Sequence, residues 1–178
     1  MPGHPFIRFS TFTAIDFETA DYYRDSACAV AAVRYENGAL AGKFSSLIRP
    51  PRKNFAFSYL HGITWEDVKS QPEFSAVWPE IEKLITGVDF IAAHNASFDR
   101  SVLHTCCVNA GIPVPKTRFL CTVNLARHRW NIYPTKLPDV CRHLNIQLDH
   151  HQAFSDALAC AEIVLRIRDN TVPLEAFI

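Results

Sequence analysis

The sequence predicts an α/β fold in which helices flank a mixed β-sheet, and three observations support this prediction. Residues 1–50 contain three segments with the alternating or β-branched patterns of strands. The remaining residues alternate helical apolar stripes with short apolar strands, an order that is typical of a mixed sheet packed against helices. A chain of 178 residues, 48% of them hydrophobic, is also long and apolar enough to bury one sizeable core.

The first strands are expected to form an antiparallel meander. Phe12–Thr19 alternates apolar residues with others, and Ala27–Tyr35 is small, apolar and β-branched. Asn37-Gly38 follows as a strong hairpin signal, because both residues tolerate the positive φ of a type I′ turn. Ala39–Ile48 then returns as the third strand, before Pro50-Pro51.

The next segment is expected to be a loop that is unusually rich in aromatic residues, Arg52–Thr64. Such residues either plug the core or form a stacking platform for nucleic-acid bases, and both interpretations stay open here. Trp65–Val68 has the pattern of one helical turn, and Glu73–Thr86 carries a helical apolar stripe. Proline is tolerated only in the first turn of a helix, so Pro79 predicts that the regular helix begins near Val77.

The second half of the chain is expected to alternate short strands with helices and to form one domain with the first half. The domain is predicted over residues 1–178 with a core from about 11 to 168, since ten residues are too few for a second domain. The expected elements are a strand at Phe90–Ala93, a helix at Phe98–Asn109, a strand at Arg118–Cys121, and helices at Thr122–Arg129, Leu137–Leu144 and Gln152–Arg168.

The net charge bears on binding to nucleic acid, and the cysteine content bears on the redox state of the protein's compartment. Eighteen basic residues balance eighteen acidic ones, so weak binding to nucleic acid is expected unless a local patch, a metal or a partner supplies the attraction. The six cysteines form no CxxC pair, which indicates free thiols in a reducing, cytoplasmic compartment and argues against zinc. No membrane association is expected, because no apolar run reaches roughly 18 residues and Met1–Phe6 does not resemble a signal peptide.

Two carboxylates on the first predicted strand are the clearest candidate for chemistry. Alternate residues of a strand share a face, so Asp16 and Glu18 should project together while Ile15 and Phe17 point into apolar packing. Two such charges raise one another's pKa unless a cation lies between them, and Mg²⁺ or Mn²⁺ suits oxygen ligands. Taken alone, such a pair is more often two solvated carboxylates at a strand end.

Three further polar residues could join this pair. Asp99 lies where a strand is expected to end and a helix to begin, and Asp156 lies in the first turns of the last helix. His151 precedes Asp156 by five residues, which turn through about 500° on a helix, so the histidine is expected on the loop before it. Four carboxylates and an imidazole suit metal-assisted phosphodiester hydrolysis. Each alone also has a structural explanation, such as a favourable helix N-terminus, an exposed face or a cap.

The motifs in their order resemble a known family of nucleases. Asp16-x-Glu18-Thr19, His94-Asn95-Ala96-Ser97-Phe98-Asp99 and His151-x-x-x-x-Asp156-Ala157 resemble the DEDDh branch of the DnaQ-like (RNase T-like) 3′–5′ exonucleases. That family includes the proofreading exonuclease subunit of bacterial DNA polymerase III and oligoribonuclease. The resemblance extends from about Thr11 to Arg168 and includes His61-Gly62-Ile63-Thr64 and Cys121-Thr122. It implies a ribonuclease H-like fold with a five-stranded mixed sheet.

The resemblance also implies a role for each motif residue. Asp16, Glu18, Asp99 and Asp156 would hold two divalent ions, Mg²⁺ or Mn²⁺. His151 would be the general base, and His150, which lies one residue too far from Asp156, is its competitor. The terminal nucleotide would be contacted by Thr19, Leu60, His61, Ile63, Asn95 and Phe98.

The leading hypothesis for function is therefore a metal-dependent exonuclease that removes nucleoside 5′-monophosphates from the 3′ end of single-stranded DNA. An exoribonuclease acting on short RNA is the alternative within the family, and nothing in the sequence identifies a group that accepts or excludes the 2′-OH. A third hypothesis is a proofreading or accessory subunit bound to a DNA polymerase. The short segment Asp169–Ile178 favours a stand-alone enzyme over a tethered subunit.

Overall fold

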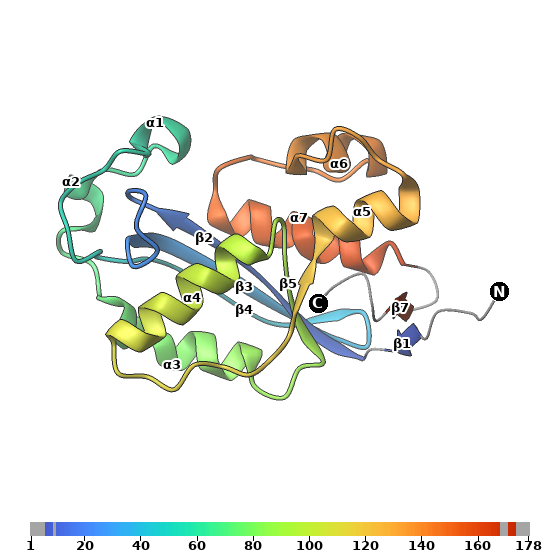
Figure 1. The fold of residues 1–178 in the computed structure, drawn as a ribbon, viewed down its shortest axis with the longest axis horizontal. Helices are drawn as coiled ribbons and strands as arrows, with labels where there is room; N and C mark the ends of the chain where they lie inside the picture. The colour runs from blue at the N-terminus through green and yellow to red at the C-terminus, as the bar shows by residue number, and fades with distance from the viewer. Residues whose placement is uncertain (1–5, 9, 168–170, 174–178) are drawn as a thin grey trace.

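A five-stranded sheet with helices on both faces forms the centre of the computed structural model (Figure 1). The structure describes residues 6–8, 10–167 and 171–173 of the 178-residue chain, so the N-terminal segment discussed above and most of the segment after Arg168 lie outside the described residues. The strands of the main sheet are β2 (Thr11–Thr19), β3 (Ala27–Glu36), β4 (Ala39–Leu47), β5 (Phe90–Ala93) and β6 (Phe119–Cys121). Two short strands, β1 (Phe6–Arg8) and β7 (Thr171–Pro173), pair separately.

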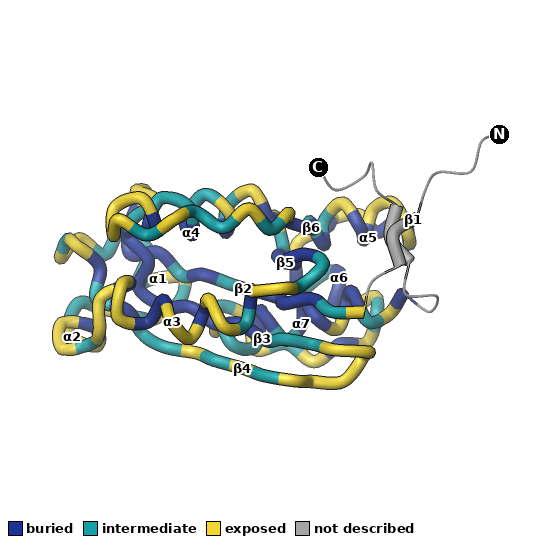
Figure 2. Tube along the Cα trace, turned by 90° about the horizontal axis from the view of Figure 1, so that it is seen from below, coloured by how far each residue is buried: buried dark blue, intermediate teal, exposed yellow. Residues whose placement is uncertain are grey.

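The strand order is β4-β3-β2-β5-β6, with antiparallel pairing among β2, β3 and β4 and parallel pairing of β2 with β5 and of β5 with β6. This arrangement confirms the predicted mixed sheet and meander. Asn37 and Gly38 have φ angles of 51° and 80°, the positive values that the predicted turn between β3 and β4 requires. Figure 2 shows that β2 and β5 are largely buried, whereas β4 is largely exposed at the sheet edge.

Seven helices connect and cover these strands in the part of the chain that the structure describes. None of them is long and apolar enough to cross a membrane. Their bounds are α1 (Ser58–His61), α2 (Trp65–Val68), α3 (Phe74–Ile85), α4 (Ser97–Asn109), α5 (Thr122–Trp130), α6 (Leu137–Leu144) and α7 (Ala153–Leu165).

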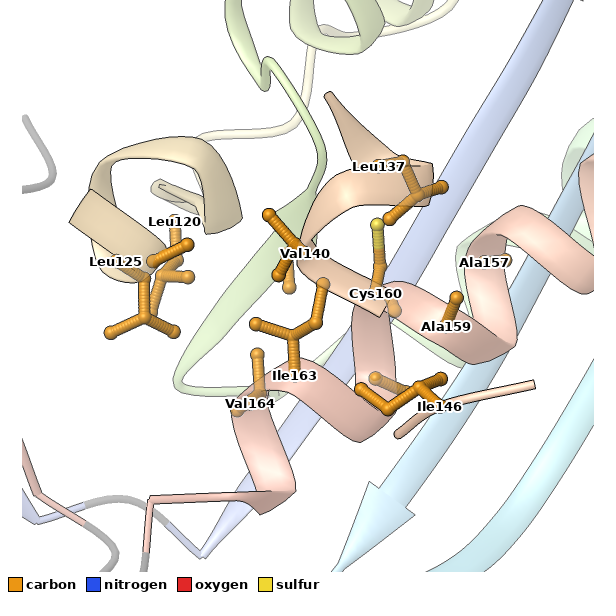
Figure 3. Packing of buried hydrophobic residues seen from close by; sticks show 14 of the residues in the cluster. Leu120, Leu125, Leu137, Val140, Ile146, Ala157, Ala159, Cys160, Ile163 and Val164 are labelled. Atoms are coloured by element: carbon orange, nitrogen blue, oxygen red, sulfur yellow. The ribbon is translucent and has the colours of Figure 1, made fainter. Parts of the chain in front are cut away.

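The alternation of β2 divides the core into two layers. Phe12 and Ala14 pack with buried residues of α5, α6 and α7, and Figure 3 shows side chains of these three helices gathered in that layer. Ile15 and Phe17 point to the other face and pack with α3 and α4, as predicted. Even-numbered residues of β2 therefore face α7, which places Asp16 and Glu18 on the α7 side of the sheet.

The helix that contains Pro79 begins earlier than the sequence predicts. Regular structure in α3 starts at Phe74 rather than near Val77, so the proline lies inside the helix. Pro79 and Ser75 are both exposed, so the Ser75 carbonyl, which lacks an amide partner, can bond to water. Burial of apolar side chains such as Phe74 and Val77, at about 1.5–3 kcal/mol each, offsets the cost of the proline, about 3 kcal/mol.

Part of the predicted aromatic loop plugs the core and part of it is exposed, whereas its use as a stacking platform for bases stays a prediction. Phe55 and Ile63 pack against a small buried cluster under the loop, whereas Tyr59 and Leu60 are exposed. The loop also contains the short helix α1, which the sequence analysis did not predict. At the other end of the chain, α7 ends at Leu165 instead of the predicted Arg168, a residue that lies outside the described ranges.

Candidate active site

The two carboxylates of β2 project together toward α7. Their partners in the neighbouring strand are small, since Asp16 lies opposite Ala31 and Glu18 lies opposite Ala29. Small neighbours leave room above this part of the sheet, which larger strand residues would fill. The pairing register shifts between Glu18 and the next residue, and such irregularities re-aim side chains at the end of a strand.

Asp156 completes a group of three carboxylates. It lies in the first turn of α7 and is only 4% exposed. Carboxylate oxygens of Asp16, Glu18 and Asp156 all lie within 4.8 Å of one another, although 138 residues separate Glu18 from Asp156 in the sequence. The fold therefore brings together three of the four carboxylates that the sequence predicts.

Asp99 reaches the same region from α4. Its Oδ1 accepts a hydrogen bond from the backbone N–H of Phe17 at 3.0 Å, between Asp16 and Glu18 on β2. The side chain is 2% exposed, and it interacts electrostatically with both β2 carboxylates. Asp99 does not belong to the group of mutually close oxygens, but it lies beside it with its Oδ1 held by β2.

Burial raises the pKa of every carboxylate in this cluster, and repulsion from a neighbouring carboxylate adds to the effect at Asp16, Glu18 and Asp99. Burial, followed by the Asp156 charge, raises the pKa of Glu18 to about 8. The pKa of Asp16 lies well above its usual value because of burial and then of Asp99, and burial also raises the pKa of Asp99 to about 8. Burial raises the pKa of Asp156 too, against the opposing effect of His150. Carboxylates that resist ionisation together fit a hard divalent cation, whose charge offsets both effects.

Two adjacent histidines flank Asp156 on the loop before α7. Nδ1 of His150 lies 3.0 Å from Oδ2 of Asp156, and the backbone N–H of His151 donates to the same oxygen at 3.2 Å. The rings are stacked with centroids 3.8 Å apart, and His151 has a φ of 67°, which is unusual for histidine. His151 lies near enough to His61 to lower its pKa, whereas His150 acts in the same way on His94.

His151 lies on the loop before α7, as predicted. Both histidines lie at hydrogen-bond distance from Asp156: His150 through a ring nitrogen and His151 through its backbone N–H. Burial and then His150 lower the pKa of His151, which keeps the imidazole neutral near pH 7 and able to accept a proton. His150, Asp156 and His151 also offer ligand atoms within 4.8 Å of one another.

The end of β2 and helix α1 bring four of the predicted substrate contacts together. Nε2 of His61 lies 3.1 Å from the Thr19 carbonyl, and Nδ1 of His61 accepts from the Ile63 N–H at 3.0 Å. Since Nδ1 is the acceptor, Nε2 carries the proton and donates to Thr19. His61 thus holds α1 against β2 next to the carboxylates, with Leu60 partly exposed beside it.

The two remaining predicted contacts lie where β5 passes into α4. Asn95 is exposed and has a φ of 63°, which turns the chain before α4. Phe98 is half-buried, and the guanidinium of Arg24 lies 4.5 Å from the centre of its ring. Arg24 was not among the predicted site residues, because its segment shows no motif in the sequence.

A cavity of about 810 Å³ extends from the carboxylates and was also not predicted from the sequence. It lies between the start of α4, the start of α5 and the segment before α6. Its lining includes Asp16, Asp156, His150, Arg100, Arg127 and Lys136. The acidic group thus forms one wall of a much larger space.

Comparison with known proteins gives consistent relatives. The RNase T model of an exonuclease family matches residues 13–164. Over 172 residues the chain is 33% identical to a PolC-type DNA polymerase III of Halalkalibacterium halodurans, which covers 91% of this chain and 12% of the polymerase. It is also 33% identical over 168 residues to the 3′–5′ exonuclease DinG of Bacillus subtilis, with 89% of this chain and 18% of DinG covered. The chain therefore spans less than a fifth of the length of either relative.

Solved structures agree with this result. Exonuclease X in complex with 5′ overhanging duplex DNA matches with a TM-score of 0.71 and 25% identity, over 87% of this chain and 89% of that one. The nuclease domain of 3′hExo, described as a DEDDh family member bound to rAMP, matches with a TM-score of 0.73 and 18% identity, over 89% and 91%. These neighbours confirm the predicted ribonuclease H-like fold. Because the family match covers most of the described sheet and its helices, this chain belongs to the RNase T exonuclease family, which confirms the predicted resemblance and, at the level of an exonuclease, the predicted enzyme class.

Proposed function

We propose that this chain hydrolyses phosphodiester bonds one nucleotide at a time from the 3′ end of single-stranded DNA, releasing nucleoside 5′-monophosphates with the help of two divalent ions, Mg²⁺ or Mn²⁺. The observation that carries the proposal is the convergence of Asp16, Glu18 and Asp156, with carboxylate oxygens within 4.8 Å and Asp99 beside them. Two further observations support the same reaction. The chain belongs to a family of exonucleases, and the raised pKa of Glu18 is typical of an acidic cluster that favours a bound cation.

The four carboxylates are the proposed ligands of the ions. Bound divalent ions supply Lewis-acid stabilisation of the attacking and leaving oxygens and favour ionisation of the attacking water. Asp99 contributes through the oxygen that Phe17 does not occupy, and the Phe17 N–H keeps that carboxylate in place. Asp156 is oriented by the His151 N–H in the same manner.

His151 is the proposed general base. A neutral imidazole at the edge of the carboxylate group can take the proton of the attacking water, and general-base catalysis contributes about 10²–10⁴ in rate. His150 is the alternative base, since its ring nitrogen lies against Asp156.

The terminal nucleotide is proposed to bind on the side of α1. His61 is joined there by hydrogen bonds to the carbonyl of the buried Thr19 and to the N–H of Ile63, and Leu60 is exposed next to it. Phe98 offers a ring for stacking, and Asn95 lies at the turn before α4. This arrangement would place the last base and sugar next to the ions.

DNA is the proposed substrate, because two relatives of this chain are a DNA polymerase III and the exonuclease DinG. Short RNA is the competing substrate, since one structural neighbour is bound to rAMP. We further propose a single exonuclease domain over residues 1–178 in the cytoplasm. A DNA polymerase is a proposed partner, by analogy with the PolC-type relatives.

The test is a degradation time course on single-stranded DNA and RNA of the same sequence, labelled at either the 3′ or the 5′ end. Shortening from the 3′ end that stops with EDTA is the expected result, and the faster sugar identifies the substrate class. If neither polymer shortens in Mg²⁺ or Mn²⁺, the hydrolase proposal is wrong and an accessory role in a polymerase complex becomes the better hypothesis.

A further inference from the structure

We infer that the cavity between α4, α5 and the segment before α6 holds the part of the substrate strand that lies 5′ of the scissile bond, and that Arg100, Arg127 and Lys136 bind its phosphates. This inference rests on the proposed function, because it specifies how the same site holds its polymer. It assigns a role to three residues that no motif of the chain includes.

The position of the cavity relative to the carboxylates supports this assignment. A scissile phosphate at the acidic group has the leaving nucleotide on one side and the remaining strand on the other. Thr19 and His61 border the acidic group on the α1 side and are absent from the lining of the cavity, whereas Asn95, the proposed nucleotide contact before α4, does line it. Asp16 and Asp156 also line it, together with residues from the starts of α4 and α5, so the cavity begins at the acidic group. Figure 1 shows that α5 and α6 lie apart from α1.

The cavity also lies in the basic part of a chain whose charge is unevenly distributed. Residues 100–148 contain seven Lys or Arg residues and one acidic residue, Asp139, whereas the rest of the chain contains eleven basic and seventeen acidic residues. The zero net charge therefore combines a strongly basic segment with an acidic remainder. This segment comprises most of α4 and all of β6, α5 and α6, and three of its basic residues, Arg100, Arg127 and Lys136, line the cavity.

The three cations in the lining have no acidic partner. Among the described residues, no carboxylate lies within ion-pair distance of Arg100, Arg127 or Lys136, whereas exposed cations elsewhere, such as Arg49 and Lys83, do form ion pairs. Unpaired cations beside an acidic centre are suited to phosphates that must approach that centre, because they offset the repulsion between phosphates and carboxylates.

Hydrogen bonds hold this basic wall in place. Nε of Arg127 donates to Oγ1 of Thr135 at 3.0 Å, and the Arg127 guanidinium lies 5.5 Å from the centre of the Tyr133 ring. Nε2 of His94 lies 2.9 Å from the Thr135 carbonyl, while Nδ1 lies 2.8 Å from Oγ1 of Thr122. Lys136 follows Thr135 directly, so its backbone is fixed next to the end of the sheet. A phosphate therefore meets a preformed wall, which lowers the entropic cost of binding.

The first test measures binding of a 5′-fluorescein-labelled thymidine hexanucleotide by anisotropy, in Ca²⁺, at several salt concentrations. Each lost phosphate contact lowers the slope of log Kobs against log salt by about 0.7, so the double variant Arg127→Gln/Lys136→Gln should lose about 1.4. Between about 50 and 200 mM salt, the affinity of the wild type should thus fall about sevenfold more than that of the variant. Lys83→Gln removes a cation from α3 and should keep the wild-type slope.

The second test compares two substrates. The nitrophenyl ester of thymidine 5′-phosphate contains a terminal nucleotide but no preceding strand, so its hydrolysis does not use Arg127 or Lys136. The ratio of kcat/KM for the hexanucleotide to kcat/KM for the ester should fall about three- to tenfold in the double variant, in proportion to two exposed charge contacts. The single variant Arg127→Lys keeps both positive charges, so its ratio should lie between that of the double variant and that of the wild type.

The outcomes separate the two proposals. An unchanged ratio together with an unchanged salt slope would overturn the strand path through the cavity. Failure of the wild type to cleave either substrate would overturn the proposed function, while the anisotropy measurement would still decide whether Arg127 and Lys136 bind the strand.

Discussion

Replacing Glu18 with glutamine should stabilise the metal-free protein near neutral pH, although Glu18 is a proposed metal ligand. In the folded protein the pKa of this carboxyl rises from 4.5 to about 8, first because it is buried and then because Asp156 repels its charge. The folded state therefore keeps a proton that the unfolded state releases above pH 4.5. Stability conferred by this group is complete below pH 4.5 and is lost as the pH rises through about 8.

The size of the effect follows from the two pKa values. One pKa unit corresponds to about 1.36 kcal/mol, so Glu18 lowers the free energy of unfolding by up to about 3 kcal/mol between pH 4.5 and pH 7. Glutamine has nearly the same shape and cannot ionise, so Glu18→Gln removes this loss. For a protein of this size, about 3 kcal/mol corresponds to an increase in Tm of about 6–12 °C.

The assay is thermal unfolding in EDTA at pH 5, 6, 7 and 8, with Glu82→Gln on the exposed face of α3 as the matched control. The Tm difference between Glu18→Gln and the wild type should be small at pH 5 and should grow toward pH 8. Addition of Mn²⁺ should reverse its sign, because the ion stabilises the wild type by binding the folded state. Parallel pH profiles for the two proteins in EDTA, or a less stable variant at pH 8, would refute the reasoning.

Three further predictions concern the site and its support. Asp16→Ala and Asp99→Asn should each abolish EDTA-sensitive cleavage while circular dichroism remains that of the wild type; cleavage at the wild-type rate in either variant would contradict the metal assignment. His151→Ala should reduce kcat by about 10²–10⁴, measured in single turnovers, and a larger loss in His150→Ala would identify His150 as the base. Ile163→Ala creates a cavity under α7, where Ile163 is fully buried, and should cost about 2–5 kcal/mol in urea unfolding without changing the metal requirement of cleavage.

Local sequence patterns were sufficient for most of the fold. The alternation in Phe12–Thr19 and the turn at Asn37-Gly38 are local signals, and both elements form as predicted. The start of α3 was misplaced, because the penalty for Pro79 is local, whereas the burial that offsets it depends on tertiary packing. Helix α1 was missed for a similar reason, since hydrogen bonds of His61 to the end of β2 stabilise a four-residue segment.

The candidate site was predictable in its acidic members and less so in its surroundings. Spacing on a strand places Asp16 and Glu18 on one face, and the family resemblance supplied the more distant residues. No sequence rule could place Arg127 and Asp156 in the lining of one cavity, because that arrangement depends on how α5 lies against the end of the sheet. The choice between His150 and His151 is likewise a matter of loop geometry, which the positive φ of His151 determines.

The acidic pair also has a consequence for how the central strand pairs during folding. A slip of β2 by one residue against β3 would move Asp16 and Glu18 into the apolar layer formed with α3 and α4, and would move Ile15 and Phe17 to the α7 side of the sheet. Each charge buried without a partner costs several kcal/mol, so the slipped pairing is strongly disfavoured. The two carboxylates therefore help to fix the register of the sheet, in addition to their proposed role as metal ligands. A variant with leucine at both positions lacks this penalty, so it should refold into a mixture of registers and aggregate more readily than the wild type.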